Sequence, residues 1–175
     1  MSAKGRRNFE KGIRMGITIG DRLPEASLVG MGEDGPEMVD LAARLAGRKA
    51  VVFALPGAFT GPCTTAHVPS FIRTADAFRA KGVDEIICIA VNDPFTLAAW
   101  GESTGATAAG ITMLGDADGA LTRALGMVFT APQLGLIGRS NRYAVLLDDG
   151  VITHANVDEP GTCDISTGEA LLATL

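Results

Sequence analysis

Cys63 is the residue of this chain best placed to act as a nucleophile. It follows the apolar run Ala50–Leu55 and a loop rich in proline and glycine, and helical spacing of apolar residues begins directly after it. A thiol at the N-terminus of a helix feels the helix dipole and unpaired backbone N–H groups, and both favour thiolate over thiol. Considered alone, Cys63 is equally well interpreted as a small core residue, as most free cysteines are.

Residues at fixed spacing around Cys63 favour a reactive thiol over a small core residue. Pro56 and Thr60 precede it in the pattern P-x-x-x-T-x-x-C, and His67 follows one helical turn later. Each has an ordinary interpretation as well, because prolines stiffen loops, threonines cap turns and histidines pack in cores. Only their joint spacing favours a reactive thiol.

The elements that must position these residues follow from alternating strand and helix patterns. Short apolar runs predict strands over residues 50–55, 85–91, 112–114 and 143–147. Apolar residues at helical spacing predict helices over residues 64–80, 95–104 and 119–126. Strands that alternate with helices imply parallel pairing through crossover connections.

The end of the chain changes character. Asp148-Asp149-Gly150 separates two strand patterns and predicts an antiparallel hairpin that continues through residues 151–156. A last helix is expected from Ser166 to Leu175, with Ser166 and Glu169 as a capping box. The whole layout predicts an α/β, thioredoxin-like sandwich: a central mixed sheet flanked by helices, with a C-terminal β-hairpin and helix.

The stretch from Ala54 to Pro69 resembles the peroxiredoxins, specifically their type-five, atypical two-cysteine and glutaredoxin-dependent branch, which typically reads PGAFTP-x-C-S-x-x-H-x-P. The resemblance continues in order through Val91–Phe95 with Trp100, Leu114–Asp116 with Leu125-Gly126, Arg139–Tyr143, Asp148–Val151 and Asn156–Gly161. It covers essentially everything after Ile17 and is highly specific.

This resemblance implies a thiol-dependent peroxidase that reduces hydrogen peroxide and small organic hydroperoxides, with peroxynitrite as a further substrate. Cys63 would be the peroxidatic cysteine, which forms a sulfenic acid. Thr60 would hydrogen-bond the thiolate and the peroxide oxygen, and Pro56 would shield the pocket from water. Arg142 would place its guanidinium beside Cys63, and His67 would support the site by orienting the loop, by raising the local positive potential, or by packing alone.

One residue departs from the family pattern. Relatives bind peroxide partly through backbone N–H groups at the cysteine and at the residue before it. Here Pro62 occupies that preceding position and has no N–H. Either the set of donors is rearranged, or the N–H of Cys63 with Thr60 and Arg142 must suffice.

The remaining cysteines have different expected roles. Cys163 lies before the last helix, where the atypical branch carries its resolving cysteine, so an internal disulfide with Cys63 is one alternative. The other is reduction of the sulfenic acid by an external thiol. Cys88 lies within a predicted buried strand and is expected to be a core residue.

The expected partners are a hydroperoxide, a reductant (glutaredoxin with glutathione, or thioredoxin) and a second copy of the chain, packed as a homodimer near the active-site loops. No metal, haem or flavin cofactor is expected, because the cysteine is itself the redox centre. The alternatives are a peroxide sensor that relays oxidation to a partner protein, which shares the first chemical step, and a thioredoxin-like binding module without catalysis.

Composition narrows the choice of function. The chain has 175 residues, a net charge of −5 and three cysteines. The acidic balance argues against nucleic-acid binding, and an odd number of cysteines argues against a disulfide scaffold. No apolar run is long enough to span a membrane and no secretory signal peptide is recognisable, so a cytoplasmic protein is expected.

Residues 1–15 are expected to form a basic N-terminal extension ahead of one domain over residues 16–175. Because this segment is short and contains Glu10, an organelle-targeting function is the less favoured interpretation.

Two apparent ligand motifs are expected to be structural. Gly30–Gly35 matches G-x-G-x-x-G but is followed by Pro36, so a hairpin turn is expected in place of a phosphate site. Asp116–Gly119 begins like a calcium loop but lacks the later ligands. The dispersed histidines and cysteines form no zinc pattern.

Overall fold

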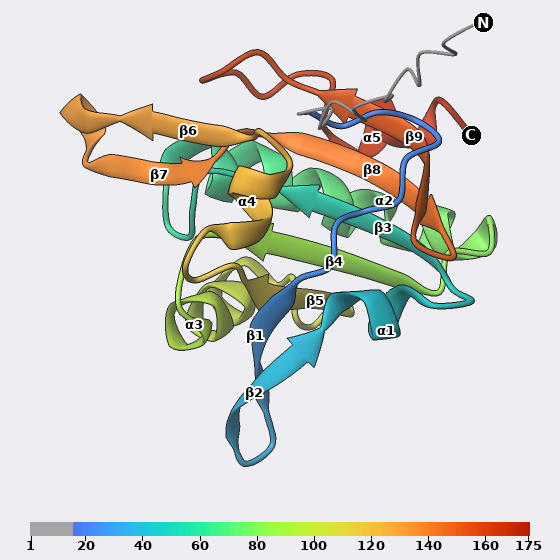
Figure 1. Ribbon diagram of the computed structural model, residues 1–175, viewed down its shortest axis with the longest axis horizontal. Helices are drawn as coiled ribbons and strands as arrows, with labels where there is room; N and C mark the ends of the chain where they lie inside the picture. Colours follow the sequence, from blue (N-terminus) through green and yellow to red (C-terminus); the bar gives the residue numbers. More distant parts are fainter. Residues whose placement is uncertain (1–15) are drawn as a thin grey trace, which may run out of the picture.

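A mixed seven-stranded sheet forms the centre of the computed structural model, which describes residues 16–175 (Figure 1). Its strand order is β2-β1-β5-β4-β3-β8-β9. The strands are β1 (Ser27–Gly32), β2 (Gly35–Asp40), β3 (Lys49–Ala54), β4 (Glu85–Ala90), β5 (Ile111–Gly115), β8 (Tyr143–Asp148) and β9 (Val151–Val157). The central strands β3, β4 and β5 are parallel, and the outer strands pair antiparallel.

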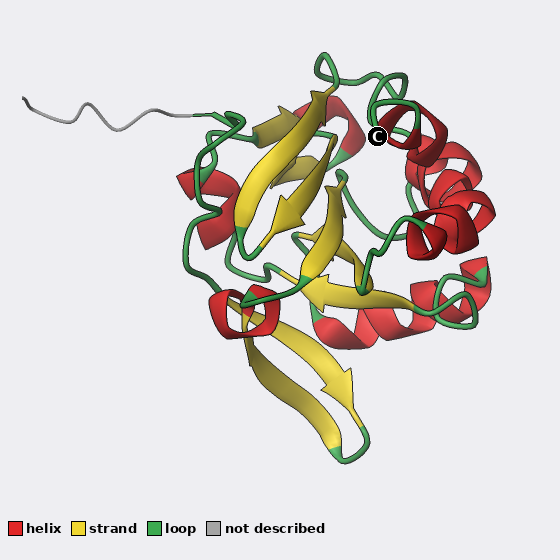
Figure 2. Ribbon diagram, turned by 90° about the vertical axis from the view of Figure 1, so that its right-hand side faces the viewer, coloured by secondary structure: helices red, strands yellow, loops and turns green. Residues whose placement is uncertain are grey.

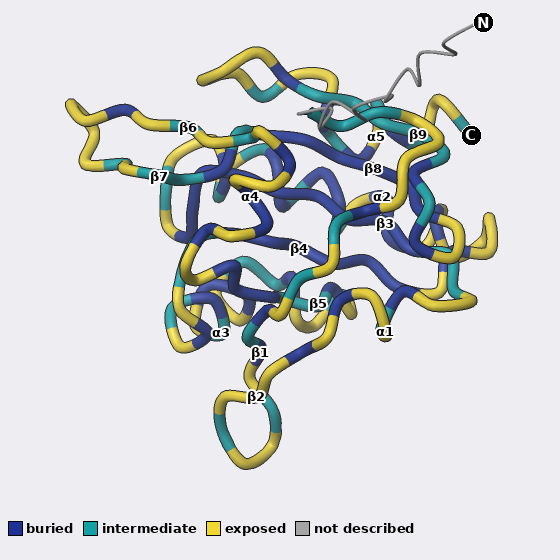
Figure 3. Tube along the Cα trace, in the orientation of Figure 1, coloured by how far each residue is buried: buried dark blue, intermediate teal, exposed yellow. Residues whose placement is uncertain are grey.

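Helices cover both faces of this sheet (Figure 2). Residues of α2 (Val68–Ala80), α3 (Pro94–Thr104) and α5 (Gly168–Leu172) join the core on one face. Residues of α1 (Leu41–Leu45) and α4 (Ala120–Ala124) join the core on the other. The central strands are therefore buried on both faces, as Figure 3 shows along β3 and β4, and the predicted thioredoxin-like fold is confirmed.

The strands and helices predicted from apolar patterns are present, with ends shifted by a few residues. The predicted C-terminal hairpin is formed by β8 and β9, and Asp149 and Gly150 form its turn with φ values of 50° and 76°. Such positive values are typical of the tight type I′ turn, which explains the Asp-Gly signal in the sequence.

The cap predicted for the last helix is wrong by one residue. Thr167, not Ser166, is the N-cap of α5, and its side chain accepts a hydrogen bond from the backbone N–H of Ala170. The hydroxyl of Ser166 instead donates to the carboxylate of Asp158. The helix is also shorter than predicted, because it ends at Leu172.

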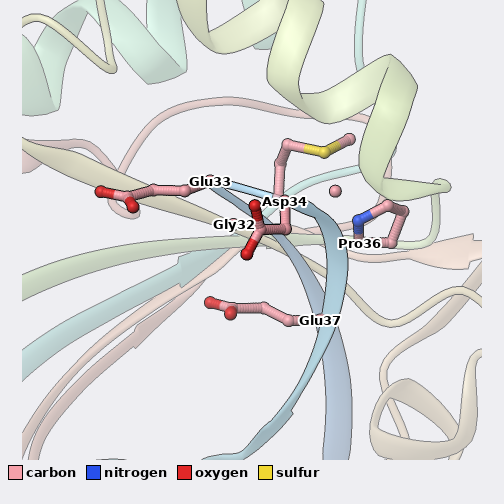
Figure 4. Close-up of a pocket in the computed structure, with 7 residues that line it drawn as sticks. Gly32, Glu33, Asp34, Pro36 and Glu37 are labelled. Carbon is pink, nitrogen blue, oxygen red and sulfur yellow. The ribbon is translucent and has the colours of Figure 1, made fainter.

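Apolar patterns did not reveal two hairpins. β1 and β2 form the first, with Gly32 paired to Gly35, so Gly30–Gly35 does form a hairpin turn. Figure 4 shows the concave face at its tip, where the carboxylates of Glu33, Asp34 and Glu37 gather. Across residues 16–175, no group of three or more His, Cys, Asp or Glu side chains has an arrangement that could hold a metal ion.

The second hairpin is separate from the main sheet. It consists of β6 (Val128–Ala131), the short 3₁₀ turn η2 (Pro132–Leu134) and β7 (Leu136–Ser140). It extends beyond the end of the sheet at which β3 and β4 finish (Figure 1).

In the described part of the chain, none of the helices has the length and apolar character needed to cross a bilayer.

Candidate active site

Cys63 and Arg142 meet at the end of β3. Cys63 is the first residue of η1 (Cys63–His67), a π-helical turn that continues into α2. Arg142 directly precedes β8, whose antiparallel register pairs Tyr143 with Ala54, the last residue of β3. The Nη1 atom of Arg142 donates to the Cys63 sulfur at 3.1 Å. The topology therefore places the guanidinium beside the thiol, as the family resemblance implied.

Burial makes this contact electrostatically strong. The Cys63 side chain has no exposed surface and Arg142 is only 5% exposed. Among residues 16–175, no carboxylate lies within 4.0 Å of the Arg142 guanidinium. A buried cation without an anionic partner is costly, and a Cys63 thiolate would supply that partner. The arrangement therefore directs the positive charge of Arg142 at the Cys63 sulfur.

The loop between β3 and η1 carries Pro56 and Thr60. Pro56 is buried, while Phe59 is 58% exposed and has a φ of 59°, a conformation that bulky residues rarely adopt. The Thr60 hydroxyl donates to the carbonyl of Gly57 at 2.7 Å. That hydroxyl has one proton, so in this arrangement it acts on any other group only as an acceptor. The structure contains no hydrogen bond from Thr60 to Cys63.

Two residues that the sequence did not single out hold this loop. The Nη1 atom of Arg139 donates to the carbonyl of Pro56 at 3.1 Å. The side-chain oxygen of Asn92, just beyond β4, accepts from the backbone N–H of Ala58 at 3.0 Å. Both residues occur in the segments that resemble the family, but contacts with a distant backbone leave no periodic signal in a sequence.

A tryptophan steadies the turn that carries Cys63. Trp100 of α3 is fully buried, and its Nε1–H donates to the hydroxyl of Thr64 at 3.1 Å. The backbone N–H of Thr64 in turn donates to the carbonyl of Thr60. The residue after Cys63 is therefore held from α3 and from the preceding loop.

His67 ties η1 to the loop before α5. Its Nε2 lies 2.9 Å from the carbonyl of Ser166, which only accepts, so Nε2 carries the proton. Burial lowers the pKa of His67 to about 4, and the charge of Arg142 adds to this effect. In its neutral form His67 adds no positive charge near Cys63, and the contact with Ser166 supports the alternative in which it orients the loop.

The loop before α5 is organised by a buried carboxylate. Asp158, 4% exposed, accepts backbone N–H bonds from Asp164, Ile165 and Ser166. Cys163 lies in this loop and is half-buried. Burial raises the pKa of its thiol, although the nearby charge of Arg142 opposes the shift.

The cysteines differ in their surroundings. Cys63 and Cys163 are free thiols in this structure. Cys88 is fully buried in β4, in the same core cluster as Cys63, and burial raises its thiol pKa. Cys88 is thus the core residue predicted from its apolar run.

Comparison with known proteins places this site in context. The Redoxin family model matches residues 18–172. A chloroplastic peroxiredoxin-2E-2 of Oryza sativa subsp. japonica is 45% identical over 91% of this chain and 72% of its own length.

Two solved structures that resemble this chain are also peroxiredoxins. Reduced Prx3 of Vibrio vulnificus in complex with hydrogen peroxide is 42% identical, with a TM-score of 0.84 over 90% of this chain and 98% of its own. Peroxiredoxin 5 of Alvinella pompejana is 34% identical, with a TM-score of 0.77 over 90% of this chain and 97% of its own.

A thioredoxin-like sandwich with a buried cysteine at the start of a helix defines a protein of the Redoxin class. Within that class, the identities and coverage show that the chain belongs to the peroxiredoxin family. It is a thiol-dependent peroxidase, with a peroxide substrate and a thiol reductant.

Proposed function

We propose that Cys63 is the peroxidatic cysteine and that it reduces hydrogen peroxide and small organic hydroperoxides. Its thiolate attacks the terminal oxygen of the peroxide, so the S–O bond forms as the O–O bond breaks. Cys63 is oxidised to a sulfenic acid, and the peroxide is reduced to water or an alcohol once the leaving oxygen gains a proton. The observation that carries this proposal is the buried contact of Arg142 with the Cys63 sulfur at 3.1 Å.

Arg142 serves two purposes in this proposal. Its Nη1 holds the thiolate, and its buried Nε has no hydrogen-bond partner among the described residues. That free donor suits a peroxide oxygen on which negative charge develops as the O–O bond breaks. No metal or other cofactor is needed for this step, because the cysteine supplies the electrons.

Thr60 and Pro56 complete the proposed pocket. Because the Thr60 hydroxyl donates to Gly57, its oxygen is free to accept the peroxide O–H and so to orient the substrate. Buried Pro56 limits the access of water. Pro62 offers no N–H, so Thr60 and Arg142 carry more of the substrate binding than in the usual family pattern.

Substitution of each cysteine tests the assignment. We expect Cys63→Ser to abolish rapid consumption of hydrogen peroxide, whereas Cys88→Ser, the matched buried control, retains it. Full activity in Cys63→Ser would overturn the mechanism. Cys163→Ser is expected to retain the first, peroxide-reducing turnover, because Cys163 would act only after the sulfenic acid has formed.

The proposed reductant is glutaredoxin with glutathione, or thioredoxin, and Cys163 is a candidate resolving cysteine. Cys163 is half-buried, and its thiol pKa responds to the charges of Arg142 and Cys63, which supports this candidacy. Mass spectrometry after one equivalent of peroxide separates the routes. A Cys63–Cys163 disulfide indicates internal resolution, and a glutathione adduct formed with added glutathione indicates external resolution.

We propose that the chain belongs to the type-five branch, which the segment from Ala54 to Pro69 and the likeness to the Alvinella peroxiredoxin 5 support. Turnover with glutaredoxin, compared with turnover with thioredoxin, tests this placement. The alternative function, a peroxide sensor, predicts rapid oxidation of Cys63 but no multiple turnover with either reductant.

We also propose that the chain forms a homodimer through the end of the sheet that carries the active-site loops. Exposed large apolar side chains occur on the elements at that end: Phe59, Phe95, Val128, Leu134 and Ile137. Exposed apolar patches of this kind mark protein interfaces.

The proposed location is the cytoplasm. The presence of Glu10 in the basic segment 1–15 supports it over organelle targeting. Fluorescent fusions of the whole chain and of residues 16–175 test this point, since only a targeting segment would make their locations differ.

A further inference from the structure

We propose that Arg139 is a positioning residue for peroxide reduction, which fixes the loop of residues 56–60 from the β6–β7 hairpin. This inference rests on the function proposed above, because it concerns the same pocket. Arg139 forms no hydrogen bond with Cys63, so it acts through the loop and not on the sulfur. The resemblance to the family assigns it no role.

The contact joins parts of the molecule that are far apart in sequence. Arg139 belongs to β7 and pairs with Phe129 of β6, outside the main sheet. Its Nη1 donates to the carbonyl of Pro56, 83 residues earlier, at 3.1 Å. Arg139 thereby connects the separate hairpin to the loop that ends at the peroxidatic turn.

Gly57 is what permits this close approach. A Cβ atom at Gly57 would lie 2.2 Å from the Nη1 of Arg139 and 3.3 Å from the side-chain oxygen of Asn92. On the other side, Asn92 accepts the N–H of Ala58. The segment 56–58 is therefore held between the hairpin and the end of β4, and only glycine leaves room for both holders.

Hydrogen bonds link the restrained segment 56–58 to Thr60 and Thr64, on either side of Cys63. The carbonyl of Gly57 accepts from the Thr60 hydroxyl at 2.7 Å, and the carbonyl of Thr60 accepts from the N–H of Thr64 at 3.1 Å. Between them, Phe59 holds an unfavourable φ of 59°. Strained backbone persists only where its surroundings over-determine it, and Arg139 is one of the groups that do so here.

Loss of Arg139 should therefore misplace Thr60 while leaving Arg142 on the sulfur. Small displacements of a positioning group cost about tenfold to a hundredfold in rate. We expect Arg139→Met to slow the single-turnover reaction of Cys63 with hydrogen peroxide at least about tenfold. Alkylation of Cys63 by iodoacetamide needs the thiolate but not the oriented peroxide, so its rate should be unchanged.

Conservative variants separate hydrogen bonding from charge. Arg139→Lys keeps the charge and an N–H donor, and Arg139→Gln keeps a donor without the charge. Both should recover much of the peroxide rate. Arg22→Met is the matched control, because Arg22 Nη1 also donates to a backbone carbonyl, that of Asp149, beside a glycine, Gly150. That contact lies on the β8–β9 turn, and its loss should leave the peroxide rate unchanged.

Gly57→Ala gives an independent route to the same loss, since the new Cβ would displace the Arg139 guanidinium. The double variant Gly57→Ala with Arg139→Met should be no slower than the slower single variant. If Arg139→Met fails to fold, the peroxide rate of Gly57→Ala is compared with that of Arg139→Lys instead.

An unchanged peroxide rate in Arg139→Met would overturn the inference. So would an equal fall in the peroxide and alkylation rates, because Arg139 would then act on the thiolate charge. A wild-type protein that alkylates readily but reacts slowly with peroxide would instead overturn the proposed function, so the two failures are distinguishable.

Discussion

At the scale of single residues, the site depends on a buried cation that has a sulfur atom as its neighbour. Arg142 is almost fully buried and lacks a carboxylate partner among the described residues. Its charge is therefore available to the thiolate and, during the reaction, to the leaving oxygen. Arg139 differs from Arg142, because its contact is with a backbone carbonyl.

Replacement of Arg142 should weaken two interactions that need its positive charge, one with the Cys63 sulfur and one with the leaving oxygen of the peroxide. We expect Arg142→Gln to slow the reaction of Cys63 with hydrogen peroxide about a hundredfold or more, as does loss of a donor in comparable oxyanion sites. Iodoacetamide alkylation at pH 7 should slow as well, since the reacting sulfur loses its cationic neighbour. Stopped-flow kinetics measure both rates, and a peroxide rate close to wild type would refute the role of Arg142.

His67 should make stability depend on pH. Its pKa is about 4 in the folded chain and about 6.5 when unfolded. The unfolded state therefore binds more protons between these two pH values. The contribution of neutral His67 to folding stability is fully present above pH 6.5 and is lost as the pH decreases to 4. The loss from this residue approaches about 3 kcal/mol.

Urea unfolding at several pH values from 7 to 4 measures this loss. His67→Gln retains a donor for the Ser166 carbonyl but does not titrate, so its stability should fall less steeply with decreasing pH. Identical slopes for wild type and His67→Gln would show that His67 does not govern the acid response.

How well the sequence predicted the site depends on how local each interaction is. Cys63 was found because a strand, a glycine-rich loop and a helix follow one another in the chain. The nearness of Arg142 was expected only through family resemblance, since β8 must first pair with β3. Arg139 and Asn92 received no role, because they contact backbone atoms that a loop brings to them only in three dimensions.

At the scale of elements, the short helix α5 depends on a close approach to α2. Gly168 is the first residue of α5, and a Cβ atom there would lie 2.3 Å from the hydroxyl of Thr74 and 2.6 Å from the carbonyl of Ser70. The backbone N–H of Gly168 donates to the hydroxyl of Ser70. Packing of the C-terminal helix therefore requires a residue without a side chain.

Gly168→Ala should destabilise the fold by about 1–3 kcal/mol, as overpacking of a tight interface usually does. Thermal or urea unfolding measures the change. Gly61→Ala is the control, because a Cβ atom there meets nothing within 4 Å and its backbone is not in the left-handed region. Equal stability of the two variants would mean that α5 moves to accommodate the methyl group at little cost.

Element prediction succeeded where apolar residues were continuous or periodic. β3 and β4 are buried on both faces and are apolar after their first residues, Lys49 and Glu85, so their runs were visible. The β6–β7 hairpin escaped prediction because its short strands are only partly buried and contain no alternation of apolar residues. The π-helical turn at Cys63 was also invisible, since it differs from an α-helix only in its hydrogen bonding.

At the scale of the whole molecule, one end carries most of the exposed apolar side chains and the active-site loop. A homodimer through this end would cover Ile137, which is 62% exposed on β7. We expect the wild-type chain to have the mass of a dimer by light scattering, and Ile137→Asp to shift it toward the monomer, because a charge would be buried at the interface.

Ile19→Asp is the matched control for this experiment. Ile19 is 61% exposed, so it has a similar exposure, but it belongs to the N-terminal segment before β1. The control should remain a dimer. A monomeric wild-type chain, or a dimer that persists in Ile137→Asp, would remove the β6–β7 hairpin from the interface.

The hydrogen bond from Trp100 to Thr64 has a practical consequence. The chain has a single tryptophan, and its indole is buried against the residue that follows Cys63. Emission from a buried indole differs in wavelength from emission in water, so any rearrangement of the turn during oxidation changes one unambiguous optical signal. The protein thus carries its own intrinsic fluorophore, and any step of its redox cycle that moves this turn is open to time-resolved observation without a label.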